Sequence, residues 1–219
     1  REEMHKSIVK KLQQFDEEFY YDDCKFSVNC EIKNDLITKT IKRTFNLRSL
    51  NDTYTLKNFK LIKLSYTKQQ SIQALVLSEL KVNGQIIDLD DKSKIKKDVI
   101  VTSEQSKSCG YDTTEEYYYV DELKLSANED TTIELNYITT VPYKDNAFAC
   151  RVGYPCKKFL LEFTLDAQSS NNYTLASHSF GFIDDAAEHV HNASRSQVKV
   201  EFNNWIFNSD GAVVVISKK

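Results

Sequence analysis

Apolar and polar residues alternate along most of the chain from residue 23 onward, and the alternation is clearest in residues 131–141 and 157–166. In each segment four apolar side chains share one parity: Ile133, Leu135, Tyr137 and Val141 in the first, and Phe159, Leu161, Phe163 and Leu165 in the second. A period of two is typical of a half-buried strand. These two segments, and the loop that joins them, form the centre of the predicted domain.

The same reading extends to twelve predicted strands along the chain. They cover residues 24–32, 36–48, 53–66, 73–82, 85–89, 98–102, 117–125, 131–141, 157–166, 172–182, 197–203 and 212–217. Asn83-Gly84 is the strongest turn signal, because a type I′ hairpin turn needs positive φ at both central residues. No crossover helices separate the strands, so we expect antiparallel pairing in a mainly β fold, a β-sandwich or a barrel-like domain.

The N-terminal segment has a different period. Residues 2–20 place Met4, Ile8, Leu12, Phe15 and Phe19 on one helical stripe, which predicts an amphipathic helix within residues 1–22. This helix either packs on the domain's own sheet or forms a self-associating stalk or juxtamembrane segment. Residues 23–219 form the β-rich domain, with an internal boundary expected near 103–116, and residues 183–196 read as a helical turn and a loop.

Composition narrows the classes of function. With 41% apolar and 28% charged residues the chain is globular, and its formal net charge of −3 gives no general attraction to duplex nucleic acid. The five cysteines are an odd number, which favours free thiols over a disulfide framework. The chain begins at Arg1 rather than Met, so we expect a preceding segment that holds a tag, a signal peptide or a membrane anchor.

Two cations in residues 36–48 have the parity of the buried face. Lys39 and Arg43 share it with Ile37, Ile41 and Phe45. A cation that points into a β interior is costly unless it is paired or faces a cavity that accepts an anion. The sequence leaves two interpretations open, an anion-binding pocket or a bulged or edge strand in which the parity shifts.

The loop after residue 141 combines aromatic and cationic side chains. Its candidate ligand contacts are Tyr143, Lys144, Arg151 and Lys157, with Tyr154 between them. Rings can stack a nucleobase while Lys and Arg hold phosphate groups. The alternative is a solvated loop whose aromatic residues cover the end of the sandwich.

Motifs for catalysis are absent from the sequence. It has no G-x-S-x-G elbow, no glycine-rich phosphate loop and no H-E-x-x-H, so we expect a non-enzymatic protein without a cofactor. Metal-capable side chains cluster only at Asp184, Asp185, Glu188, His189 and His191. Their spacing does not match known metal sites, and we expect no metal centre there.

The last strands carry a resemblance to a known group of proteins. Val198, Val200 and Phe202 alternate before Trp205-Ile206-Phe207, and Asp210-Gly211 precedes a valine-rich strand at 213–216. This arrangement resembles the end of β-rich sensor domains in bacterial membrane-anchored antiphage effectors. The resemblance implies a soluble β domain behind transmembrane helices that senses a nucleotide signal, and it assigns no ligand residue.

Together these observations predict a sensor domain on the cytoplasmic face of a membrane, which binds a nucleotide second messenger or a similar small anion in a compact basic pocket. A homo-oligomer formed through the N-terminal helix would fit this role. The alternative is a protein–protein interaction or adhesion module, secreted or at the cell surface, whose β edges or loops bind a partner and whose cysteines pair as Cys24–Cys30 and Cys150–Cys156. A metal-dependent hydrolase that uses residues 184–191 is the third candidate.

Overall fold

The computed structural model describes residues 18–67, 73–102, 113–180, 189–207 and 210–219. In chain order its elements are β1 (Phe19–Lys33), β2 (Leu36–Ser49), β3 (Thr53–Thr67), β4 (Leu75–Val82), β5 (Gln85–Ile86), β6 (Ile95–Thr102), β7 (Thr113–Ser126), β8 (Thr131–Pro142), the 3-10 helix η3 (Tyr143–Asp145), β9 (Ala147–Arg151), β10 (Phe159–Leu165), the short helix α2 (Ser169–Asn172), β11 (Tyr173–Phe180), β12 (His189–Ala193), β13 (Gln197–Phe202) and β14 (Gly211–Lys218).

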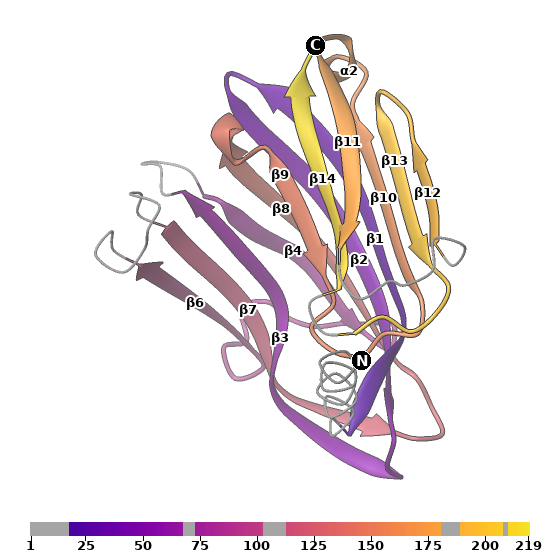
Figure 1. Cartoon of the computed structure of the whole chain (residues 1–219). Coiled ribbons are helices and arrows are strands. Elements are labelled where there is room, and N and C mark those ends of the chain that lie inside the picture. The colour runs from indigo at the N-terminus through magenta and orange to yellow at the C-terminus, as the bar shows by residue number, and fades with distance from the viewer. Residues whose placement is uncertain (1–17, 68–72, 103–112, 181–188, 208–209) are drawn as a thin grey trace.

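The strands form one large sheet and two small ones (Figure 1). The large sheet has eight strands in the order β12-β13-β10-β1-β2-β8-β4-β5, and the small sheets have the orders β11-β14-β9 and β3-β7-β6. Both small sheets lie on the same face of the large one, because Phe148 of β9 contacts Phe163 and Phe59 of β3 contacts Phe45. The fold is therefore mainly β with two layers, as the alternation predicts.

Alternation decides which face of each strand is buried. In β8 and β10 all the predicted inward positions, from Ile133 to Val141 and from Phe159 to Leu165, belong to the hydrophobic core. The outer positions of the same strands are only partly covered, so one face of the large sheet carries mostly polar residues. The predicted hairpin turn is confirmed, with positive φ at Asn83 (51°) and Gly84 (76°) between β4 and β5.

Two strands and one pairing differ from the sequence analysis. Strand β9 lies within the expected loop, and β12 occupies residues expected to be a helical turn and a loop. Strands β1 and β10 pair in parallel, with Cys24 opposite Phe159, rather than antiparallel. The long chain between them, which contains other strands of the fold, takes the place of a crossover helix.

The predicted N-terminal helix lies mostly outside the described residues. Residues 19–22, which we assigned to it, belong to β1, where Phe19 and Tyr21 are buried in the core. The boundary expected near 103–116 covers the connection from β6 to β7 and the first residues of β7, and the two strands pair from Ile95–Val120 to Thr102–Thr113. That segment therefore connects two paired strands. Within the described ranges, no helix is long and apolar enough to span a bilayer.

The four cysteines that the structure describes are buried thiols, namely Cys24, Cys30, Cys150 and Cys156. The pairing of Cys24 with Cys30 is excluded by geometry, because both lie on β1 and six residues of strand span about 20 Å, whereas a disulfide needs Cα atoms within about 7 Å. Cys150 and Cys156 are also unpaired, which corrects the second predicted bridge.

Candidate functional site

Arg43 lies inside the sandwich and contacts both layers. Its Nη1 donates a hydrogen bond to the carbonyl oxygen of Leu61 on β3 at 2.8 Å, and its guanidinium carbon lies 4.6 Å from the ring centroid of Phe45 and 4.8 Å from that of Phe26. Aromatic rings whose centroids lie within about 6 Å of a desolvated cation attract it. The guanidinium thus links the large sheet to β3 and packs against aromatic side chains.

Lys39 is the second inward cation, and its side chain is only 3% exposed. Its Nζ lies 5.5 Å from the ring centroid of Phe148 on β9, and no carboxylate among the described residues is within ion-pair distance. Burial lowers the pKa of Lys39 below its ordinary value, and the nearby Cys30 and Asp145 oppose this shift. Lys39 therefore has no hydrogen-bond acceptor or carboxylate partner among the described residues, whereas Arg43 has the carbonyl of Leu61, although its Nε has no partner.

Thr139 adds a second unmet polar group beside Lys39. It is the direct cross-strand neighbour of Lys39 in the β2–β8 pair, and it is 2% exposed. Its Oγ1 has no hydrogen-bond partner. Two adjacent polar side chains without hydrogen-bond partners lower the stability of a dry interior. This end of the sandwich therefore suits a polar ligand or water.

Strand β2 is neither an edge strand nor bulged between the two cations. It lies between β1 and β8, and its pairing with β8 is continuous from Leu36–Pro142 to Leu47–Thr131. A shifted parity therefore does not explain Lys39 and Arg43, and both side chains point into the sandwich. Whether either contacts a ligand stays a prediction.

Two of the four predicted loop contacts lie at the end of the sandwich where β8 finishes. Tyr143 is half-buried, and its backbone N–H donates to the carbonyl oxygen of Asp35 in the β1–β2 turn at 2.8 Å. Its ring centroid is 5.5 Å from that of Tyr173. The Nζ of Lys218 lies 5.6 Å from the same ring, and Lys144 is exposed beside it.

The other two predicted contacts lie at the opposite end, because β9 carries the chain away from η3. Arg151 ends β9 and its guanidinium is 5.1 Å from the ring centroid of Phe180. Lys157 forms an ion pair with Asp22 at 3.4 Å. Tyr154 packs on Phe19 with ring centroids 4.5 Å apart, inside an aromatic cluster. The six candidate residues therefore fall into three separate places.

Tyr173, Lys218 and Thr139 complete the group at the β8 end, and sequence reasoning did not single them out. Tyr173 and Lys218 are cross-strand partners in β11 and β14. Nothing local in the sequence connects them with Tyr143, since the contact depends on how the two layers stack. We call the set Lys39, Thr139, Tyr143, Lys144, Tyr173 and Lys218 the lysine–tyrosine end.

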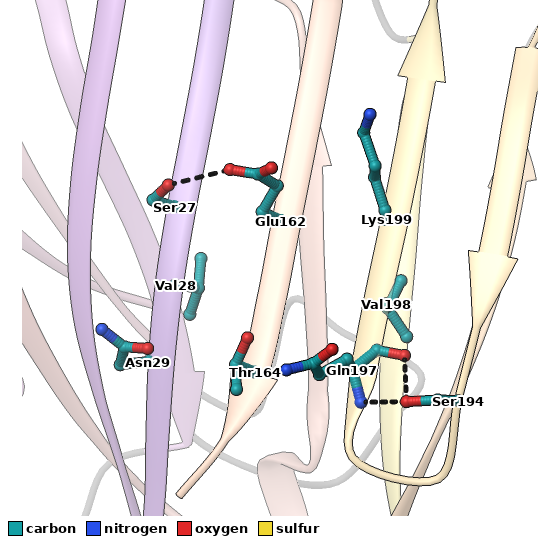
Figure 2. Close-up of a pocket in the computed structure, with 9 residues that line it drawn as sticks. All are labelled: Ser27, Val28, Asn29, Glu162, Thr164, Ser194, Gln197, Val198 and Lys199. Carbon is teal, nitrogen blue, oxygen red and sulfur yellow. Dashed lines mark hydrogen bonds between the residues drawn. The ribbon is translucent and has the colours of Figure 1, made fainter.

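A hollow of about 500 Å³ lies elsewhere, on the open face of the large sheet (Figure 2). Its side chains come from β1, β10 and the β12–β13 hairpin, and the cross-strand row Asn29, Thr164 and Gln197 runs across it. Its charges are balanced: Glu162 pairs with Lys25 at 3.3 Å, and Lys199 pairs with Glu201 at 2.9 Å.

The hollow is not the compact basic pocket that the sequence analysis expects. Among the described residues its lining has no aromatic ring and no net positive charge, which a base and its phosphates would need. Hydroxyl and amide groups of this kind suit a neutral polar ligand.

The metal-capable cluster lies largely outside the described residues, since nothing is described for residues 181–188 or for the side chains of His189 and His191. In the part of the chain that the structure describes, no three His, Cys, Asp or Glu side chains are grouped to hold a metal ion.

Comparisons with known proteins identify no family. No family model matches the chain, and no curated protein matches it in sequence. Among solved structures, a candidate protease from Parabacteroides distasonis is 12% identical with a TM-score of 0.46, over 92% of this chain and 40% of that one. A candidate nutrient-binding protein from Legionella pneumophila is 10% identical with a TM-score of 0.44, over 91% and 67%.

An M1 zinc metallopeptidase from Deinococcus radiodurans is 9% identical with a TM-score of 0.42, over 91% of this chain and 42% of that one. The chain thus spans about two fifths of the length of the two peptidase-related structures. At these identities and TM-scores, it is not shown to share an activity with any of the three.

Proposed function

We propose that the chain is a non-catalytic ligand-binding domain that recognises a nucleotide-type anion at the lysine–tyrosine end. The observation that carries the proposal is the half-buried ring pair Tyr143–Tyr173, which lies beside the exposed cations Lys144 and Lys218. Aromatic rings stack on bases, and ammonium groups bind phosphate as point charges. Ring and cation are side by side here, which the charge-balanced hollow does not offer.

Lys39 adds a buried cation to the exposed ones at this end of the sandwich. Its amine lies in the interior at the same end, beside the unpartnered hydroxyl of Thr139. An anion that reached Lys39 would favour its charged form, which burial disfavours. Arg43, Arg151 and Lys157 are not in the proposed contact set, because each lies in another part of the fold, Arg43 beside Phe45, Arg151 beside Phe180 and Lys157 beside Asp22.

The biological role that we propose is that of a sensor on the cytoplasmic side of a membrane-anchored antiphage effector. This role rests on the resemblance of the last strands and goes beyond the ligand proposal. It is tested by phage plating on bacteria that express the full-length protein, with the Lys144→Gln, Lys218→Gln double variant as control. Equal plating on wild-type, variant and empty-vector cells would reject the role.

The ligand proposal is tested by thermal unfolding of the purified chain with ATP, cyclic dinucleotides and inorganic pyrophosphate. A ligand at about 100 times its Kd stabilises the folded state by about 2.7 kcal/mol, which raises the Tm of a domain this size by roughly 5–10 °C. We expect the rise with a nucleotide and its loss in the Lys144→Gln, Lys218→Gln double variant.

A matched control carries the same number of charge changes at the opposite end, Arg151→Gln with Lys157→Gln. It should keep the full rise in Tm. No rise with any of the probes, or an equal loss in both double variants, would reject binding at the lysine–tyrosine end.

A further inference from the structure

Strand β6 is the outer strand of the sheet β3-β7-β6, and its second half is apolar and open. Val99 and Ile100 are 55% and 51% exposed, although both are β-branched residues on a strand. Adjacent strand residues point to opposite faces, so both faces of the sheet end in an exposed apolar side chain at this edge. Exposed apolar edges are what soluble β proteins normally protect.

On alternate residues of β6 the backbone N–H and C=O groups point away from β7 and can pair with another strand. The N–H of Asp121 on β7 donates to the carbonyl oxygen of Lys94, which fixes the alternation of the β6–β7 ladder. Lys96, Asp98 and Ile100 therefore direct their backbone groups toward β7, while Lys97 and Val99 direct theirs outward. The outward groups have the spacing that another extended chain requires.

The other edge of the same sheet is protected. Along β3, Asn58 has a positive φ of 51°, and the pairing with β7 shifts between Lys60 and Ile62. Lys57, Lys60 and Lys63 are also exposed on this strand. A bulge, a left-handed residue and lysines are the features that prevent strand addition. Among the described residues the small sheet thus has one open edge, so pairing of two copies through it would end at a dimer.

The charges of β6 favour a second copy as the occupant. When two β6 strands run antiparallel with a two-fold axis at Ile100, the outward backbone of Val99 meets that of residue 101 of the second copy. Ile100 then faces Ile100 of the second copy across the strands. Lys96 and Lys97 of the two copies lie at opposite ends of the paired segment, so like charges do not meet.

We propose that two copies of this chain associate through β6, which joins their small sheets into one six-stranded antiparallel sheet. This dimer is independent of the proposed ligand site and uses a different surface. It is a weak dimer, because a single eight-residue strand offers far less than the roughly 800 Å² per partner of a standard interface.

Sedimentation equilibrium of the purified chain tests the proposal. We expect the weight-average mass to rise above 25.3 kDa, toward twice that value, as the concentration increases from about 10 μM to about 1 mM, the range for a weak interface. Val99→Lys and Ile100→Lys should each hold the mass at the monomer value, and unchanged Tm values would show that these exposed sites leave the fold intact.

Ile86→Lys is the matched control, since Ile86 is 71% exposed on β5, at an edge of the large sheet. It should associate like the wild type. A wild-type mass that stays monomeric at the highest concentration would overturn the proposal. Association that survives Val99→Lys and Ile100→Lys would overturn it too, because the contact would then lie elsewhere.

Hydrogen exchange gives a second readout that a merely structural role of β6 would not move. At low concentration the amides of Asp98 and Ile100 should be protected by β7, and those of Lys97 and Val99 should exchange fast. At high concentration the amide of Val99 should slow by about tenfold or more as the dimer forms. Exchange at Val99 that is the same at both concentrations would contradict pairing through this edge.

Discussion

The two buried cations, Lys39 and Arg43, differ in the hydrogen-bond acceptors and aromatic rings around them. Arg43 has a carbonyl acceptor and several aromatic rings, and it holds β2 against β3. Lys39 has one ring and a neighbouring hydroxyl that itself lacks a partner. A cation that is left without an acceptor lowers stability, and such sites persist more often for function than for folding. Lys39 is therefore the residue at which stability and ligand binding are most directly linked.

Replacement of Lys39 by Met should stabilise the ligand-free protein by about 1–3 kcal/mol at neutral pH, because it removes a buried polar group without removing volume. Burial lowers the pKa of Lys39 in the folded state below its ordinary 10.5. At pH values between the folded-state pKa of Lys39 and 10.5, the unfolded chain binds more protons than the folded chain. The unfolding free energy of the wild type therefore rises with pH in this range. The advantage of Lys39→Met should therefore shrink as the pH approaches 10.5.

Urea unfolding of both proteins across this pH range measures the effect. The control is Lys42→Met, since Lys42 lies on the same strand with its side chain exposed on the opposite face. It should change stability little at any pH. An advantage of Lys39→Met that is the same at neutral and alkaline pH would show that its amine is not disfavoured by burial.

At the scale of elements, the small sheet β11-β14-β9 depends on a close approach of two backbones. Gly211 begins β14 opposite Arg151, and a Cβ at this position would overlap the carbonyl oxygen of Cys150. Because the obstacle is backbone, it cannot turn aside as a side chain can. The Asp210-Gly211 pair is thus a requirement for joining β14 to β9, in addition to its place in a turn.

We expect Gly211→Ala to lower the unfolding free energy by about 1–3 kcal/mol, the usual cost of forcing extra volume into a packed site. Gly153→Ala is the control, since nothing lies within 4 Å of a Cβ there, and it should cost less than about 0.5 kcal/mol. The urea midpoints of the two variants and the wild type decide the comparison. Equal midpoints for the two variants would rule out the overlap.

The alternation of apolar and polar residues was sufficient to predict strands in which it continues over many residues, such as β2, β8 and β10. It failed for β9, whose inward residues Phe148 and Cys150 are too few to establish a period. The parity of β2 correctly indicated that Lys39 and Arg43 point inward. It could not place Tyr173 and Lys218 beside Tyr143, because that contact depends on which sheets stack, and the parallel β1–β10 pair was missed for the same reason.

For the whole molecule, the described thiols report on the integrity of both layers. Cys24 and Cys30 lie on the large sheet, and Cys150 lies on the small sheet that contains β9. Burial raises the pKa of each, in the case of Cys30 to about 12, so the reactive thiolate is scarce in the folded state.

Without reductant, the unfolded chain should titrate five thiols with an aromatic disulfide reagent, one for each cysteine of the sequence. In the native protein the four described thiols should react only as fast as the fold opens, and urea should accelerate all four together. Fewer than five thiols after unfolding would reveal a disulfide. Rapid labelling of two or more thiols in the native protein would show that the layers open separately.

The parallel pair at the centre of the large sheet also sets the order in which the chain can be completed during synthesis. Ser27 and Glu162, which are neighbours across β1 and β10, are 135 residues apart in sequence. At about 5–20 residues per second, a ribosome takes roughly 7–27 s to make the chain between them. Throughout that interval one side of the 15-residue strand β1 has no partner. The nascent protein therefore exposes this edge of β1 until Phe159–Leu165 emerges, and the open edge is an opportunity for misassembly and for chaperone binding.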